Sequence, residues 1–438
     1  MDRCARKYGP ACARPAAALV AALSLIGAAP LPAAPLDEEP VQRLHASAEH
    51  APQADPIARG DAAAREGDLA SADGIYREAW ESMAYRQRAT DALHRLHRHP
   101  SFTLSVDEGN IRRTLGQLGN EFVRYETAHF IVLSDCAPDW SRRRAELLEE
   151  TRRAFFRITG KMNLPAYPHR EKLVCILFNE HGKYRSFARA NDGLAASWVA
   201  GYYATQSNRI VFYNDVTSPA TAAARDRLQS SERRMKEFRD QAARAEAERH
   251  SDLAQRLHAS ADDMDKQIQA QHAQLGRHAA ACSTAKTIHE AIHLLAFNTG
   301  AQLPDRDYPF WLSEGFATGF ETEDAAAAFG PDRSGGTELR LERFREMCRQ
   351  GRLLPLEELI GLGEVPGWDG DTAETMYSLG HVLFAQLYRQ NPQRLGEYIQ
   401  AFGRESAGRL SRERQIQLFT TYFGSVDAVE RRLSRAGR

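Results

Sequence analysis

The chain has 438 residues, enough for roughly two or three domains that each bury a core. Its 57 Lys and Arg residues nearly balance its 58 Asp and Glu residues, and the formal net charge at pH 7 is -1. This balance excludes a protein whose overall field attracts nucleic acid or an anionic membrane surface.

Residues 1–34 are predicted to be an export signal. Several basic residues precede an apolar run at residues 16–29, which is short for a membrane span but suits the core of a signal peptide. Cleavage would leave no membrane span and would place the protein in a bacterial periplasm or outside the cell. An uncleaved signal would instead anchor it to a membrane. Residues 35–55 are rich in Pro, Ala and acidic residues and are expected to form a linker.

The cysteines that follow the signal region are Cys136, Cys175, Cys282 and Cys348. In an oxidising compartment they could pair, although the sequence does not fix the connectivity. The chain has no Cys-x-x-Cys sequence, which argues against a zinc site built from cysteines.

Residues 56–115 are predicted to form a helical hairpin. Small and aromatic residues follow a spacing that resembles one tetratricopeptide repeat: Ala64, Gly67, Ala72, Tyr76 and Ala79. Only one such unit is visible, whereas a stable array needs about three. We therefore expect a hairpin that packs on the next domain.

Residues 116–217 are predicted to form a small mixed sheet with helices. The apolar runs at 129–133 and 173–178 have the length of strands, and the amphipathic segment 142–161 between them indicates a helix. Residues 201–203 and 209–213 are typical of the two strands of a hairpin.

Residues 218–280 are predicted to form an inserted coiled-coil hairpin. Ser218 and Pro219 suit the start of a helix, and helix-forming residues continue to about residue 276. The apolar spacing of the two halves does not join across residues 249–252, which favours two antiparallel arms. The small seam residues predict a weak core, so one continuous helix, or a protein partner filling the seam, is the alternative.

The chemistry of the chain centres on His289-Glu290-Ala291-Ile292-His293, an HExxH motif. Residues four apart share a helical face, so both imidazoles can reach one metal ion. Glu290 lies beside that face and can take a proton from water without binding the metal. The alternative is a helix with two surface histidines. An apolar stripe predicts a buried helix and argues against that alternative: Ile288, Ile292, Leu295 and Ala296.

Glu314 is the candidate third metal ligand. Asn298-Thr299-Gly300 is a stop signal for the first helix, and a second helical stretch follows with the sequence Trp311-Leu-Ser-Glu314-Gly-Phe-Ala. Catalytic zinc binds three protein ligands and keeps a position open for water. Glu314 on a second packed helix would complete this set.

Residues 281–438 are predicted to form a mainly α-helical subdomain that carries the metal ligands. Glu321 lies seven residues after Glu314 on nearly the same expected helical face, where it could accept a hydrogen bond from a histidine ligand or be a surface residue. Tyr377 and His381 lie four apart at the start of a helix, so both can face one cleft.

The HExxH motif followed about twenty residues later by Trp311-Leu-Ser-Glu314-Gly resembles the gluzincin metallopeptidases. The second segment is similar to WLNEGFA of the aminopeptidase N family, with Ser313 where Asn is usual. It is more similar to a bacterial gluzincin-like family of unknown function with HExxH…FNTG…WLSEG and GxY…NRIxxY segments. The strong part covers about residues 286–321, and weaker similarity extends over about 125–215 and 350–435.

This resemblance implies an α+β gluzincin-like fold, with a small mixed sheet and a mainly helical catalytic half. It also implies a Zn²⁺ ion on His289, His293 and Glu314, a peptide or protein substrate, and peptide-bond hydrolysis by water with Glu290 as general base. The aminopeptidase N family has a GAMEN segment that grips the substrate amine. This chain has none, so the resemblance does not extend to aminopeptidase specificity.

The resemblance also assigns roles to residues outside the metal set. An edge strand beside the HExxH helix holds the substrate backbone in gluzincins, and Gly201, Tyr202 and Tyr203 match it; an ordinary sheet edge is the alternative. A downstream Tyr or His often donates a hydrogen bond to the developing oxyanion. Tyr377 fits this position best and His381 is second, whereas a Tyr that only packs at a helix start is the alternative.

Three functions fit these observations. The first is a zinc-dependent peptidase. The second is a catalytically inactive peptidase-like scaffold that acts as an envelope protein-interaction module through its helical units. Such scaffolds usually lose a ligand or the general base, and neither is missing here. The third is an ester or amide hydrolase that uses the same activation of water.

Overall fold

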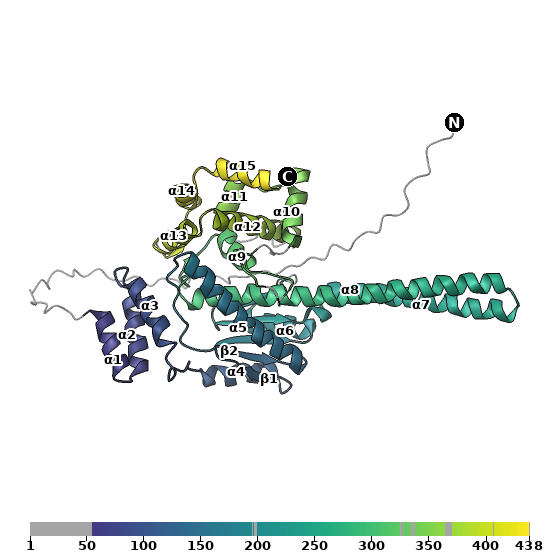
Figure 1. The fold of residues 1–438 in the computed structure, drawn as a ribbon, viewed down its shortest axis with the longest axis horizontal. Helices are drawn as coiled ribbons and strands as arrows, with labels where there is room; N and C mark the ends of the chain where they lie inside the picture. Colours follow the sequence, from purple (N-terminus) through teal and green to yellow (C-terminus); the bar gives the residue numbers. More distant parts are fainter. Residues whose placement is uncertain are drawn as a thin grey trace, which may run out of the picture.

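The structure is a computed structural model that describes residues 55–194, 196, 199–324, 326, 328–333, 338–363, 370–405 and 407–437. The expected signal and nearly all of the expected linker lie outside these ranges. The fold is mixed α+β, about 66% helical with a small mixed sheet, which confirms the expected fold class at this level. A central body carries three helices at one end, and a long helical hairpin projects from the other (Figure 1).

The N-terminal unit has three helices, so the prediction of a helical hairpin was wrong. They are α1 (Pro56–Arg65), α2 (Leu69–Glu81) and α3 (Arg86–Leu96). Gly67, with φ of 84°, lets the chain turn after only one short helix, and the Asp68 side chain caps the next helix. The unit packs on the body, where the Trp80 indole N–H donates to the Pro165 carbonyl at 2.9 Å.

The sheet has five strands in the order β1-β2-β3-β5-β4. They are β1 (Val123–Glu126), β2 (Phe130–Ser134), β3 (Leu173–Phe178), β4 (Gly201–Ala204) and β5 (Arg209–Tyr213). The neighbours β2, β3 and β5 run parallel and are buried at every residue, as parallel strands covered on both faces usually are. The antiparallel strands β1 and β4 form the two edges. β1 was not predicted, because its four residues contain no continuous apolar run.

Helices fasten the sheet to the rest of the body. α4 (Glu108–Leu118) precedes the first strand. α5 (Pro138–Lys161) packs on β1 and β2, and α6 (His181–Asp192) packs on β3 and β5. The longest helix, α8 (Ser251–Asn298), packs on β4, β5 and α5. The C-terminal part of α8 is therefore enclosed between the sheet and the helices that follow it.

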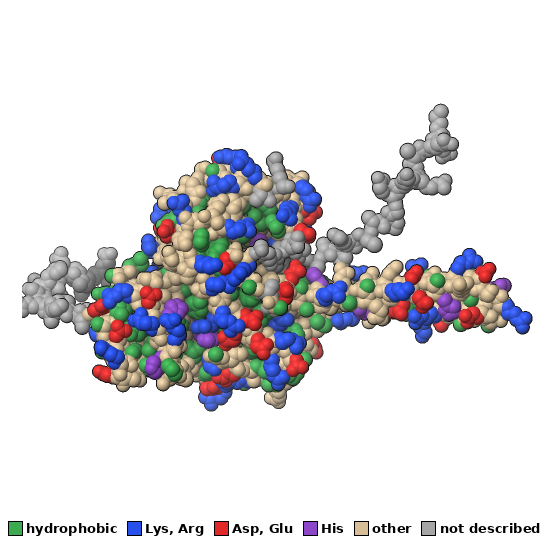
Figure 2. Space-filling view, viewed as in Figure 1, with side chains coloured by type: hydrophobic (Ala, Val, Ile, Leu, Met, Phe, Trp, Pro, Cys, Tyr) green, Lys and Arg blue, Asp and Glu red, His purple; other side chains and the backbone are tan. Residues whose placement is uncertain are grey.

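The projecting hairpin consists of α7 (Pro219–Ala247) and the first half of α8. The prediction of two antiparallel arms is confirmed, and the turn lies at residues 248–250, where Arg249 has φ of 62°. The second arm does not end at residue 280, however. It continues unbroken into the HExxH motif, because Gly276 alone weakens a helix without ending it. On the visible face of this hairpin, cationic and anionic side chains are mixed (Figure 2).

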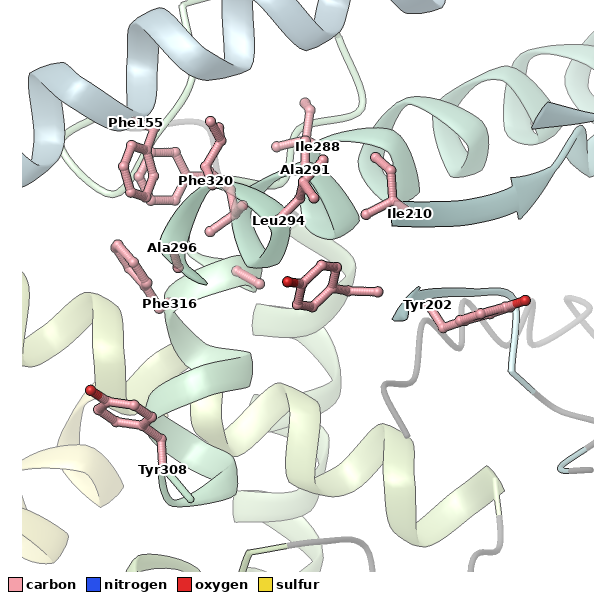
Figure 3. Close-up of a cluster of buried hydrophobic side chains, with 14 of the residues drawn as sticks. Phe155, Tyr202, Ile210, Ile288, Ala291, Leu294, Ala296, Tyr308, Phe316 and Phe320 are labelled. Atoms are coloured by element: carbon pink, nitrogen blue, oxygen red, sulfur yellow. The ribbon is translucent and has the colours of Figure 1, made fainter. Parts of the chain in front are cut away.

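The C-terminal half stacks helices on the side of α8 opposite the sheet (Figure 1). They are α9 (Phe310–Thr318), α10 (Glu338–Gln350), α11 (Leu356–Gly361), α12 (Gly370–Gln390), α13 (Pro392–Gly403), α14 (Arg412–Phe423) and α15 (Val426–Ala436). Short elements complete the chain: η1 (Asp215–Thr217), β6 (Arg306–Asp307) and β7 (Gly408–Arg409). Figure 3 shows the core that results: Ile288, Ala291 and Leu294 of α8 lie among Ile210, Phe316 and Phe320 from other elements.

The structure bears on two expectations that followed from the predicted export signal: pairing of the cysteines and the presence of a membrane span. Cys136, Cys175, Cys282 and Cys348 are all free thiols, so the pairing that an oxidising compartment would allow does not occur among them. Over the ranges that the structure describes, no helix is both long and apolar enough to span a bilayer.

Candidate metal centre

His289 and His293 lie one turn apart on the enclosed part of α8. Their Nε2 atoms are 3.2 Å apart. The side chains are 0% and 1% exposed, because the sheet covers one side of this turn and α9 the other. Two imidazoles thus converge at one buried point.

Glu314 completes the group from α9. Its Oε2 lies 3.2 Å from His289 Nε2 and 3.6 Å from His293 Nε2. Close packing of α9 on α12 fixes its position, since a Cβ at Gly315 would lie 2.7 Å from the Gly380 carbonyl oxygen. The motif therefore needs its glycine for packing as well as its glutamate for chemistry.

The three donor atoms suit one zinc ion. Zinc binds histidine nitrogen and carboxylate oxygen at about 2.0–2.2 Å, and tetrahedral ligands at that range lie about 3.3–3.6 Å apart. The three separations here run from 3.2 to 3.6 Å. Two imidazoles and one carboxylate also match a catalytic zinc site, whereas structural zinc takes four protein ligands.

Glu321 holds the far side of the first histidine. Its Oε1 lies 2.8 Å from His289 Nδ1, and because a carboxylate only accepts, Nδ1 carries the proton and Nε2 is left for a metal. The side chain is 1% exposed, which excludes a surface glutamate. The prediction that Glu321 shares a helical face with Glu314 was wrong, because α9 ends at Thr318. A turn after the helix places Glu321 beside His289 instead.

Glu290 is fully buried next to the donor group. Neither carboxylate oxygen has a hydrogen-bond partner among the described residues. Burial raises the pKa of Glu290 to about 8, with the nearby Glu314 charge adding to the effect. A buried carboxylate without a partner destabilises a fold and is typical of a functional site.

The electrostatics of the group favour a cation. Burial disfavours the charged form of His289, but hydrogen bonds to Glu314 and Glu321 outweigh it and raise the pKa of His289 to about 10. Burial opposes ionisation of Glu314 as well, yet the charges and hydrogen bonds of His293 and His289 lower its pKa to about 2. The ionised carboxylates of Glu314 and Glu321 beside two imidazoles thus stabilise positive charge at this position.

The strand β4 lies at the sheet edge beside α8, as expected for residues 201–203. The tyrosine side chains are engaged in packing: Tyr202 donates to Asp192 at 2.6 Å, and the Tyr203 ring stacks on Phe297. Gly201 faces the centre, because a Cβ there would lie 3.0 Å from Glu290 Oε1. This edge therefore offers backbone groups directly beside the candidate base.

Gly201→Ala tests whether this edge serves the site. The added methyl should displace Glu290. For a centre that works through this carboxylate, kcat should fall by about ten- to a hundredfold, since small misplacements of reacting groups are costly. Metal content should not change. Gly276→Ala on α8 is the matched control, because a Cβ there meets nothing within 4 Å. Equal kcat for both variants would show that β4 is an ordinary sheet edge.

Tyr377 and His381 lie on α12, which packs against α9. The Tyr377 ring centroid is 6.0 Å from that of His289. His381 Nδ1 lies 3.1 Å from the Thr318 carbonyl oxygen and must donate to it, so Nε2 lacks a proton in the neutral ring. Burial and the Arg340 charge lower the pKa of His381 to about 4, which keeps the ring neutral. Neutral His381 in this tautomer has no donor left for an oxyanion, which favours Tyr377.

Two buried cations near the centre were missed by sequence reasoning. Arg340 on α10 forms a two-bond ion pair with Glu321, with both distances at 2.7 Å. Lys286, one turn before Glu290, lies 2.9 Å from Asp215 Oδ2, outside hydrogen-bond geometry, and 3.8 Å from the Tyr213 ring centroid. Lys286 could have been found from the sequence, because a lysine in an otherwise apolar helical stretch indicates a buried charge. Arg340 could not, because it is one of several charged residues in an amphipathic helix.

The comparisons with known proteins bear on this part of the chain. A family model described as a protein of unknown function (DUF1570) matches residues 283–405. The matched stretch spans HExxH, Glu314, Arg340 and Tyr377. No curated protein and no solved structure matches the chain. The family description assigns no activity, so the function rests on the geometry of the site.

Proposed function

We propose that the protein is a zinc-dependent metallopeptidase of the gluzincin type. The observation that carries the proposal is the convergence of His289, His293 and Glu314 beside the carboxylate of Glu290, which has no hydrogen-bond partner among the described residues. Zinc bound to these three ligands would supply a Lewis acid and bring the pKa of water toward about 7.

The residues around the ligands divide the remaining work. Glu290 takes a proton from the attacking water and returns it to the departing amine. The Tyr377 hydroxyl donates to the carbonyl oxygen as negative charge develops on it. The backbone of β4, the edge strand beside α8, aligns an extended peptide, as a sheet edge can.

Burial sets a condition on substrate entry. His289, Glu290, His293 and Glu314 are at most 4% exposed. A peptide therefore reaches the centre only when neighbouring segments open locally, as in enzymes that close over their substrates. Segments of unfolded or flexible protein suit such a site better than rigid folded surfaces.

The other functions are supported less well. An ester or amide hydrolase would use the same groups, but a sheet edge beside the base favours a substrate with a peptide backbone. An inactive interaction module, with the α7–α8 hairpin holding a protein partner, would not need a complete ligand set and an unpartnered buried carboxylate. The proposed location, a periplasm or the exterior with the signal removed or kept as an anchor, rests on the pattern of residues 1–34.

The proposal is tested by loading the protein with zinc and following cleavage of an unfolded protein. We expect about one zinc per chain, cleavage that stops when a chelator removes the metal, and recovery when zinc is returned. Zinc bound in full without any cleavage would favour the inactive scaffold.

Tyr377→Phe tests the oxyanion donor. Loss of the hydroxyl should lower kcat by about a hundredfold with zinc content unchanged. His381→Ala should have a smaller effect, because its free nitrogen is an acceptor. An unchanged kcat in Tyr377→Phe beside a collapse in His381→Ala would assign the role to the histidine.

A further inference from the structure

We propose that Arg340 is a positioning residue with two roles. It orients the metal ligand His289 through Glu321, and it also orients the ring of Tyr377. The inference rests on the proposed metal site, and it concerns a residue on α10, an element that contributes no ligand. Arg340 is 4% exposed and lies in the first turn of α10, so its charge must be matched inside the protein.

The guanidinium grips Glu321 with two bonds. Arg340 Nε donates to Oε2 and Nη2 donates to Oε1, both at 2.7 Å. A paired fork of this kind fixes the plane of a carboxylate as well as its distance. The same Oε1 accepts from His289 Nδ1 at 2.8 Å. The orientation of the imidazole therefore depends on a carboxylate that Arg340 holds in place.

Arg340 also contacts the tyrosine side of the centre. Its guanidinium carbon lies 5.3 Å from the Tyr377 ring centroid, and that ring lies edge-on to His289. A cation over an aromatic face is attractive, more so away from water. One side chain thus touches both the group that orients a ligand and the proposed oxyanion donor.

The charges around the centre support this role. Glu290, Glu314 and Glu321 are buried carboxylates. A divalent ion on the ligands and the single charge of Arg340 would balance them when all three are ionised. Lys286, the other buried cation near the centre, is already paired with Asp215. Without Arg340, Glu321 would be a buried charge held only by a histidine, which is costly.

The test measures zinc affinity by competition with a chromophoric chelator. Arg340→Met should weaken zinc binding by about ten- to a hundredfold, the usual effect of losing a group that orients a metal ligand. Arg340→Lys keeps the charge but cannot form the fork, so its affinity should fall between those of Arg340→Met and the unaltered protein. The visible spectrum of the cobalt-loaded protein should shift in both variants, since it reports ligand geometry.

Arg209→Met is the matched control. Arg209 is also 4% exposed and pairs with Asp192 at 3.0 Å, but it contacts no ligand. It should lose stability and keep its zinc affinity. Zinc affinity within twofold of the unaltered protein in Arg340→Met, with an unshifted cobalt spectrum, would overturn the inference. If Arg340→Met does not fold, the same result in Arg340→Lys would overturn it. Failure of the unaltered protein to bind zinc would instead overturn the proposed function.

Discussion

Glu290→Gln should remove nearly all turnover while zinc stays bound. Glutamine has the shape of glutamate, but its amide cannot accept a proton from water at neutral pH. General base catalysis contributes about 10²–10⁴-fold to a rate, so kcat should fall by that factor. The measurement is kcat on a fluorogenic peptide for protein whose zinc content has been verified.

The stability of the same variant gives an independent control. Glu290 is buried without a hydrogen-bond partner among the described residues, so replacing its carboxylate with a neutral amide should not lower Tm. Loss of turnover with an unchanged or higher Tm separates a chemical role from a structural one. A near-normal kcat would mean that another group activates the water.

His293→Ala should lose the metal. The substitution removes one of the three donors. A water molecule in place of the imidazole would bind the metal less tightly than a histidine does. Zinc per chain, measured by elemental analysis after dialysis, should fall from about one to near zero, and turnover should fall with it. If the Tm of His293→Ala matches that of the zinc-depleted unaltered protein, the loss of turnover results from loss of the metal and not from damage to the fold.

His258→Ala is the matched control for this variant. His258 lies on the same helix, α8, but in the projecting hairpin, where it contacts Glu246 at 3.0 Å. It should keep zinc and activity. Full zinc occupancy in His293→Ala would contradict the ligand assignment, whatever the activity.

The sequence predicted those parts of the site that depend on local spacing. The two histidines share a helical face because they are four residues apart, and the apolar runs of β2 and β3 have strand length. Glu314 followed from the second motif. These features need no knowledge of distant contacts, which is why they could be predicted.

Other features depend on contacts between distant segments. Glu321 reaches His289 because α9 ends at Thr318 and the chain turns, and Arg340 reaches Glu321 from a separate helix. The continuity of α8 through Gly276 was missed, because a weak helix former alone does not decide where a helix ends. Spacing within one segment carries no information on such contacts.

The most direct test of the central claim is digestion of a mixed peptide library, read out as new peptide termini by mass spectrometry. The zinc-loaded protein should produce new termini that disappear with a chelator and are absent with Glu290→Gln. Hydrolysis of simple esters without any new peptide termini, or termini that persist in Glu290→Gln, would contradict a zinc-dependent peptidase.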